Sequence, residues 1–72
     1  MIRVILIVPY TDVSNVIELL RKAGFNIEVM IKQSFQPYVT IEATAYMTME
    51  EAWQFLEENS LLKYLSQIRH TY

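Results

Sequence analysis

The chain has 72 residues, six basic and eight acidic side chains and a formal net charge of −2, and this length predicts one small domain over residues 1–72. It contains no cysteine, which excludes disulfides and thiolate chemistry and fits the reducing cytoplasm, where we expect the protein. The acidic balance argues against nucleic-acid partners, which need a cationic surface. The longest apolar run, Val4 to Val8, is too short to cross a membrane.

The expected first strand, Ile2–Val8, is apolar on both of its faces. Alternate positions of a strand point to opposite sides of the sheet. One side carries Ile2, Val4, Leu6 and Val8, and the other carries Ile5 and Ile7. A strand that is covered on one side only should alternate apolar with polar residues. The pattern therefore predicts that a ligand, a partner or a second copy of the chain covers the other side.

An amphipathic helix is expected after Pro9. Thr11 or Asp12 is placed to cap its start through a side-chain oxygen. Gly24 is the only glycine, and it stands where a left-handed residue would close the helix. Apolar residues recur at helical spacing at Val13, Val16, Ile17, Leu20 and Ala23.

Two further strands, Phe25–Lys32 and Tyr38–Tyr46, are expected on either side of a hairpin loop, Gln33–Pro37. Strict alternation in the earlier strand places Ile27, Val29 and Ile31 against the helices and Met30 on the open face. In the later strand, the positions expected on the open face are Tyr38, Thr40, Glu42, Thr44 and Tyr46.

A second helix is expected to begin at Thr48, because Thr48 and Glu51 have the spacing of a capping box. Asn59 and Ser60 end or redirect this helix. Its expected buried stripe consists of Met49, Ala52, Trp53 and Leu56.

The tail Leu61–Tyr72 matches two patterns. Leu61, Leu65, Ile68 and Tyr72 have helical spacing, whereas Tyr64, Ser66, Ile68, His70 and Tyr72 would form one face of a strand. We favour the strand, because it would cover the edge beside the first strand.

The element order βαββαβ predicts an α+β, ferredoxin-like sandwich: a four-stranded antiparallel sheet in the order 4-1-3-2 with two helices on one face. The first strand is then central. Its open face is expected to be apolar in the middle, with tyrosines and carboxylates around it.

The stretch Val16–Glu28, which runs from a helix through Ala23-Gly24 into an Asn26-Ile27 strand, resembles the first helix and second strand of an ACT domain. ACT domains are small regulatory modules that pair with one another, and many bind amino acids. The resemblance implies a regulatory module with an amino-acid-like effector bound near Tyr10 and Asp12. Asp12 would hold the family's acidic position, but the segment Pro9–Val13 lacks the turn glycine.

No catalytic residue, metal site or cofactor is predicted. His70 is the only histidine and has no partner at metal-ligand spacing. Glu28 and Glu42 could act as an acid–base pair on the open face. An ordinary cross-strand pairing with Lys32 or Arg3 is the favoured interpretation.

The candidate interface residues are Ile5, Ile7, Met30, Phe35, Tyr38 and Tyr46. Tyrosines are common anchors of protein interfaces, and the basic signature of an RNA-binding sheet is missing. Phe35, in the hairpin loop, either folds back on the core or anchors a partner.

Three functions remain open. The favoured one is a non-catalytic interaction or regulatory module that forms a homodimer, or binds another protein, through the open sheet face. The alternative is a small inhibitor or adaptor of the kind encoded by mobile elements, which docks on a larger protein. The third is an enzyme of the dimeric α+β barrel type.

Overall fold

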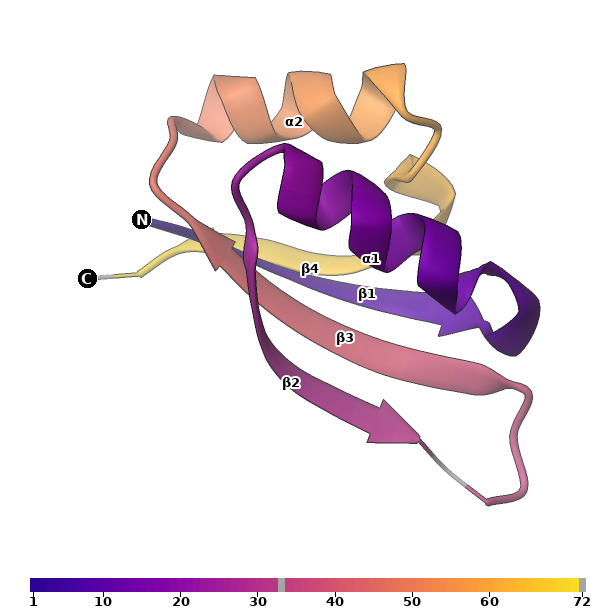
Figure 1. The fold of residues 1–72 in the computed structure, drawn as a ribbon. Coiled ribbons are helices and arrows are strands. Elements are labelled where there is room, and N and C mark those ends of the chain that lie inside the picture. The colour runs from indigo at the N-terminus through magenta and orange to yellow at the C-terminus, as the bar shows by residue number, and fades with distance from the viewer. Residues whose placement is uncertain (33, 72) are drawn as a thin grey trace.

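The computed structural model describes residues 1–32 and 34–71, so Gln33 and Tyr72 lie outside the described residues. Two helices cover one face of a four-stranded antiparallel sheet (Figure 1). The strand order β2-β3-β1-β4 is the predicted order, and the tail forms the predicted strand. The elements are β1 (Ile2–Pro9), η1 (Tyr10–Asp12), α1 (Val13–Lys22), β2 (Asn26–Lys32), β3 (Tyr38–Ala45), α2 (Met49–Glu58), η2 (Leu62–Tyr64) and β4 (Leu65–His70).

The core lies between the sheet and the two helices. Alternate residues of β1 and β3 fill it from the sheet side, as the sequence predicts. Each fully buried aliphatic side chain contributes about 1.5–3 kcal/mol to folding. The buried apolar residues are Ile2, Val4, Leu6, Val8, Val16, Leu20, Phe25, Val39, Ile41, Ala43, Ala45, Ala52, Leu56 and Leu61.

Both helices end in the same hydrogen-bonded motif. After α1, the Gly24 N–H donates to the Arg21 carbonyl and the Phe25 N–H donates to the Leu20 carbonyl, with Gly24 at a φ of 95°. After α2, the Leu61 N–H donates to the Leu56 carbonyl in the same way. The left-handed position there is held by Ser60, at a φ of 58°. These bonds satisfy the last helical carbonyls and return the chain to the core.

The helix starts differ from each other. The predicted capping box of α2 is confirmed: the Glu51 N–H donates to Thr48 Oγ1 at 3.1 Å, and the Thr48 N–H donates to Glu51 Oε1 at 3.0 Å. These bonds, above all the one from the Thr48 backbone, lower the pKa of the Glu51 carboxyl. Asp12 occupies the N-cap position of α1, but its side chain makes no capping hydrogen bond, and the Thr11 hydroxyl donates to Asp12 Oδ1. The predicted cap by Thr11 or Asp12 is therefore wrong.

Trp53 does not belong to the buried stripe of α2, where the sequence analysis placed it. Its side chain is 42% exposed. Trp53 directly follows the buried Ala52, and the helix turns by about 100° per residue, so Trp53 points away from the core. Phe55 packs against the core instead, with its ring centroid 5.5 Å from that of Phe25.

A β-bulge at Glu28 changes which side chains of β2 face the helices. Ile27 lies opposite Ala43, but Val29 lies opposite Glu42, so Glu28 is an extra residue with no residue of β3 directly opposite it. An extra residue shifts the alternation by one position. Met30 therefore lies opposite the buried Ile41, on the helix side of the sheet, and its predicted place on the open face is wrong. Val29 and Ile31 take the open face instead.

Candidate functional site

The open face of the sheet, turned away from the helices, is arranged in rows of side chains across the strands. Residues directly opposite each other in an antiparallel pair lie on the same face, so the register defines these rows. From the start of β1 to its end, the rows are Arg69, Arg3, Thr44 and Asn26; Gln67, Ile5, Glu42 and Val29; Ile7, Thr40 and Ile31; and Pro9 and Tyr38.

Polar side chains of β1, β2 and β3 are bonded to one another near the start of β1, and we call this region, together with Arg69 of β4, the charged end. Arg3 Nη1 lies 3.5 Å from Glu42 Oε1, and both side chains are about one-quarter exposed. Thr44 Oγ1 donates to Glu28 Oε1 at 2.9 Å, and Asn26 Nδ2 donates to the same oxygen at 3.1 Å. Glu28 and Glu42 each have their own partners, which favours the pairing interpretation over an acid–base pair.

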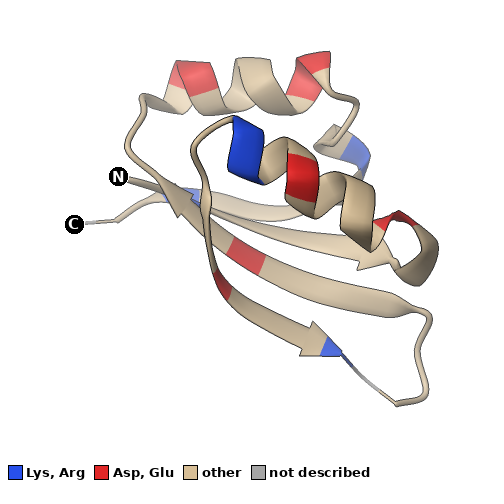
Figure 2. Cartoon of the chain, viewed as in Figure 1, with Lys and Arg blue, Asp and Glu red and all other residues tan. Residues whose placement is uncertain are grey.

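The other end of the open face is apolar and exposed to solvent. We call Ile7, Val29, Ile31 and Tyr38 the apolar patch; they are 44%, 36%, 47% and 46% exposed. Thr40 connects Ile7 to Ile31, and Ile5 is half-buried beside the patch. Figure 2 shows no charged position on the second half of β1 or the first half of β3. Contiguous exposed apolar side chains of this kind mark interaction sites.

Sequence reasoning missed Val29 and Ile31 as members of this surface. Period-two alternation assumes an unbroken ladder, and the bulge at Glu28 breaks it. A signal was present in the apolar run Val29-Met30-Ile31, which does not fit a strand with one polar face.

Two predicted interface aromatics lie outside the rows. Phe35 is 99% exposed in the hairpin that extends beyond the helices (Figure 1), so it does not fold back on the core. Tyr46 is 87% exposed and follows the last residue of β3. The base of the hairpin is attached to the end of β1, because the Tyr10 N–H donates to the Pro37 carbonyl at 2.8 Å.

The predicted effector residues are already in contact with the chain's own side chains. Asp12 Oδ2 accepts a hydrogen bond of 2.5 Å from the Tyr64 hydroxyl, which raises the pKa of Tyr64. The ammonium group of Lys32 lies 4.7 Å from the ring centroid of Tyr10, within the range of a cation–π contact.

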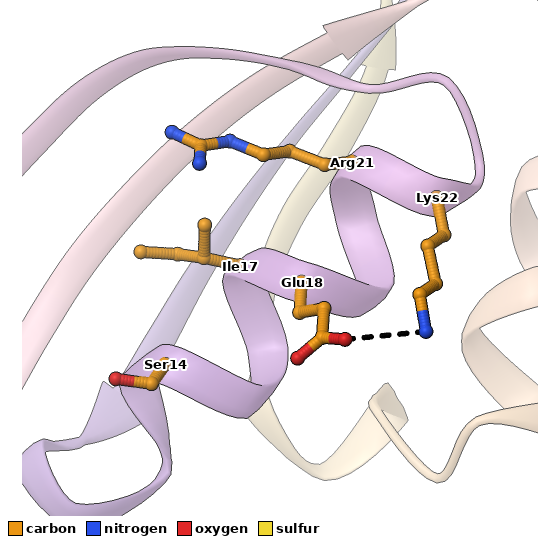
Figure 3. A pocket seen from close by; sticks show the side chains of 5 residues that line it. All are labelled: Ser14, Ile17, Glu18, Arg21 and Lys22. Carbon is orange, nitrogen blue, oxygen red and sulfur yellow. Dashed lines mark ion pairs between the residues drawn. The ribbon is translucent and has the colours of Figure 1, made fainter.

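A shallow depression of about 400 Å³ lies along the outer surface of α1 (Figure 3). Its lining comes from one helix face, with Arg21 and Ile17 extending to one side and Glu18 and Lys22 forming an ion pair at 3.2 Å on the other. A groove on a single helix encloses little ligand surface. Neither Tyr10 nor Asp12 lines it.

The described residues contain no cluster of three or more His, Cys, Asp or Glu placed to hold a metal ion. His70 is an exposed residue of β4, opposite Ile2. In residues 1–32 and 34–71, both helices are ten residues long, and neither has the length or hydropathy to span a membrane. The chain matches no protein-family model, no curated protein and no solved structure.

Proposed function

We propose that this chain is a non-catalytic interaction module of ferredoxin-like, ACT-like architecture that associates with a second copy of itself through the open sheet face. One observation carries the proposal: the side chains of the apolar patch are exposed together on one face, while Arg3, Glu42, Thr44 and Glu28 beside it are bonded within the chain. Burying such a patch against a partner is favourable at about 25 cal/mol per Å² of apolar surface.

The element order and the strand order support the ferredoxin-like assignment. The regulatory role that the ACT resemblance implies stays part of the proposal. The contacts of Asp12 with Tyr64 and of Tyr10 with Lys32 do not favour an effector site there, because a ligand would have to displace both.

The experiment is the solution mass of the Ile7→Lys variant, measured by light scattering on a sizing column. A lysine in the middle of the apolar patch would place a charge in the interface, so we expect the variant to be monomeric. Leu62→Lys is the matched control, because Leu62 is 38% exposed on η2, outside the open face. A dimeric Ile7→Lys protein would assign association to another surface.

A further inference from the structure

The charges of the open face are divided between its two halves. The basic side chains lie on β4 and β1, at Arg69 and Arg3, and the acidic ones lie on β3 and β2, at Glu42 and Glu28. Glu28 belongs to this face because its carboxylate accepts from Thr44, which lies opposite Arg3. The face is therefore basic along one edge and acidic along the other.

Within the part of the chain that the structure describes, Arg69 is the basic charge of this arrangement without an ion-pair partner. It lies directly opposite Arg3 on the neighbouring strand, and like charges at such positions repel. Arg3 has Glu42 as its partner, whereas the ion pairs of the described residues do not include Arg69. A carboxylate from outside the chain would relieve this repulsion.

Two simple two-fold arrangements could bring a second copy onto this face. An axis in the interface and perpendicular to the strands would place the charged end of each copy on the apolar patch of the other. An axis along the strands keeps each row against the same row of the second copy, and it places β4 over β2 and β1 over β3. Only the second arrangement places the apolar patch of one copy on the apolar patch of the other, and the basic edge of one copy on the acidic edge of the other.

We propose that the chain forms an isologous dimer about a two-fold axis close to the strand direction, in which Arg69 of each copy pairs with Glu28 of the other. This inference rests on the proposed function and specifies its geometry. The two Arg3–Glu42 pairs meet at the axis. Ile7 of each copy seats on Thr40, beside Ile31, of the other. Aligned sheet packing of this kind is common in β-sandwiches.

The size of the face supports the participation of the charged end. Four strands about 4.8 Å apart, the longest of eight residues at about 3.4 Å per residue, give a face of at most roughly 19 by 27 Å, or about 500 Å². Stable interfaces bury about 800 Å² on each partner. The apolar patch covers only part of this area, so an interface that also includes the charged end comes closer to that value.

The test uses two single charge reversals, Arg69→Glu and Glu28→Arg, first separately and then mixed. Each variant alone places like charges at both contacts, which should raise its dimer dissociation constant by about tenfold or more. In the mixed dimer, the two substituted side chains face each other at one contact, and the native Arg69 and Glu28 face each other at the other contact. Both contacts are then attractive. Light scattering of the mixture should therefore show the dimer mass at concentrations where each variant alone is monomeric.

Four results would overturn the inference. If the mixture stays monomeric, or if the single variants dimerise like the wild type, Arg69 and Glu28 of the two copies do not face each other. Loss of the dimer in Ile7→Lys would still support the proposed function in that case. A monomeric wild type would overturn both. If Glu28→Arg does not fold, mild oxidation of mixed Arg69→Cys and Asn26→Cys proteins gives the same test, because the chain has no cysteine of its own. A mixed disulfide dimer supports the geometry, and its absence contradicts it.

Discussion

The Tyr64 hydroxyl donates a hydrogen bond to the Asp12 carboxylate across 52 positions of the chain. Asp12 is the last residue of η1 and Tyr64 the last of η2, so this bond joins the turn after β1 to the turn before β4. The bond also explains why Asp12 stands at the N-cap of α1 without capping it. The carboxylate is turned toward Tyr64 instead of toward the first N–H groups of the helix.

Replacing Tyr64 with Phe should lower the melting temperature at neutral pH, since the hydrogen bond to Asp12 is lost. Hydrogen bonds to charged acceptors are stronger than those to neutral ones, but solvent weakens them at a site as exposed as this one, so we expect a small decrease. Because the folded state raises the pKa of Tyr64, the contribution is complete below the ordinary tyrosine pKa of 10.0 and is lost as the pH rises through the raised value. Thermal melts between pH 7 and pH 11 measure both effects.

The control for this pair is Tyr46→Phe, because the Tyr46 ring is 87% exposed. It should melt as the wild type does. Equal melting of Tyr64→Phe and the wild type at pH 7 would show that the bond contributes nothing to stability.

At the C-terminal ends of α1 and α2, a glycine in the left-handed position should favour stability, so adding one and removing one should have opposite effects. Ser60→Gly should raise stability by up to about 1 kcal/mol, because a residue with a side chain is strained at a φ of 58°. Gly24→Ala should lower stability by about 1–2 kcal/mol for the same reason. A Cβ at Gly24 would meet no atom within 4 Å, so the cost there is conformational rather than steric. Urea unfolding of both variants checks the signs, and a stabilised Gly24→Ala would contradict this account.

The capping box predicts that the effect of Glu51→Gln depends on pH. The folded state lowers the pKa of Glu51 below its ordinary 4.5, so its charge stabilises the fold above that pH and ceases to do so as the pH falls through the lowered value. The melting temperature of the wild type should therefore exceed that of Glu51→Gln most clearly at neutral pH, and this difference should become smaller as the pH falls. Thermal melts from pH 7 to pH 3 test this. A difference that stays constant over that range would exclude the ionised carboxylate as its cause.

The bulge at Glu28 makes a prediction about neighbouring residues. Ile31→Lys should prevent self-association because Ile31 lies on the open face, opposite Thr40. Met30→Lys, one residue earlier and equally exposed, should leave the dimer intact because Met30 lies on the helix side. Sizing with light scattering compares the two variants. The reverse order of effects would mean that β2 alternates without a bulge.

The sequence predicted those features that depend on local patterns. The alternation of β1 and β3, the stripe of α1, the capping box at Thr48 and the role of Gly24 all follow from spacing within a few residues. The features that it missed depend on tertiary structure. The bulge at Glu28 exists only in the pairing of β2 with β3, and the engagement of Asp12 by Tyr64 joins distant positions. The open face was identified through Ile5, Ile7 and Tyr38, but its composition on β2 required the register.

The most direct test of self-association through the open face is the solution mass of the wild-type chain, measured by light scattering over a range of concentrations. If the open face mediates self-association, the mass should reach twice the 8.5 kDa of the chain as the concentration rises. A mass that stays at 8.5 kDa throughout would contradict this expectation and would leave the apolar patch of Ile7, Val29, Ile31 and Tyr38 to a different protein.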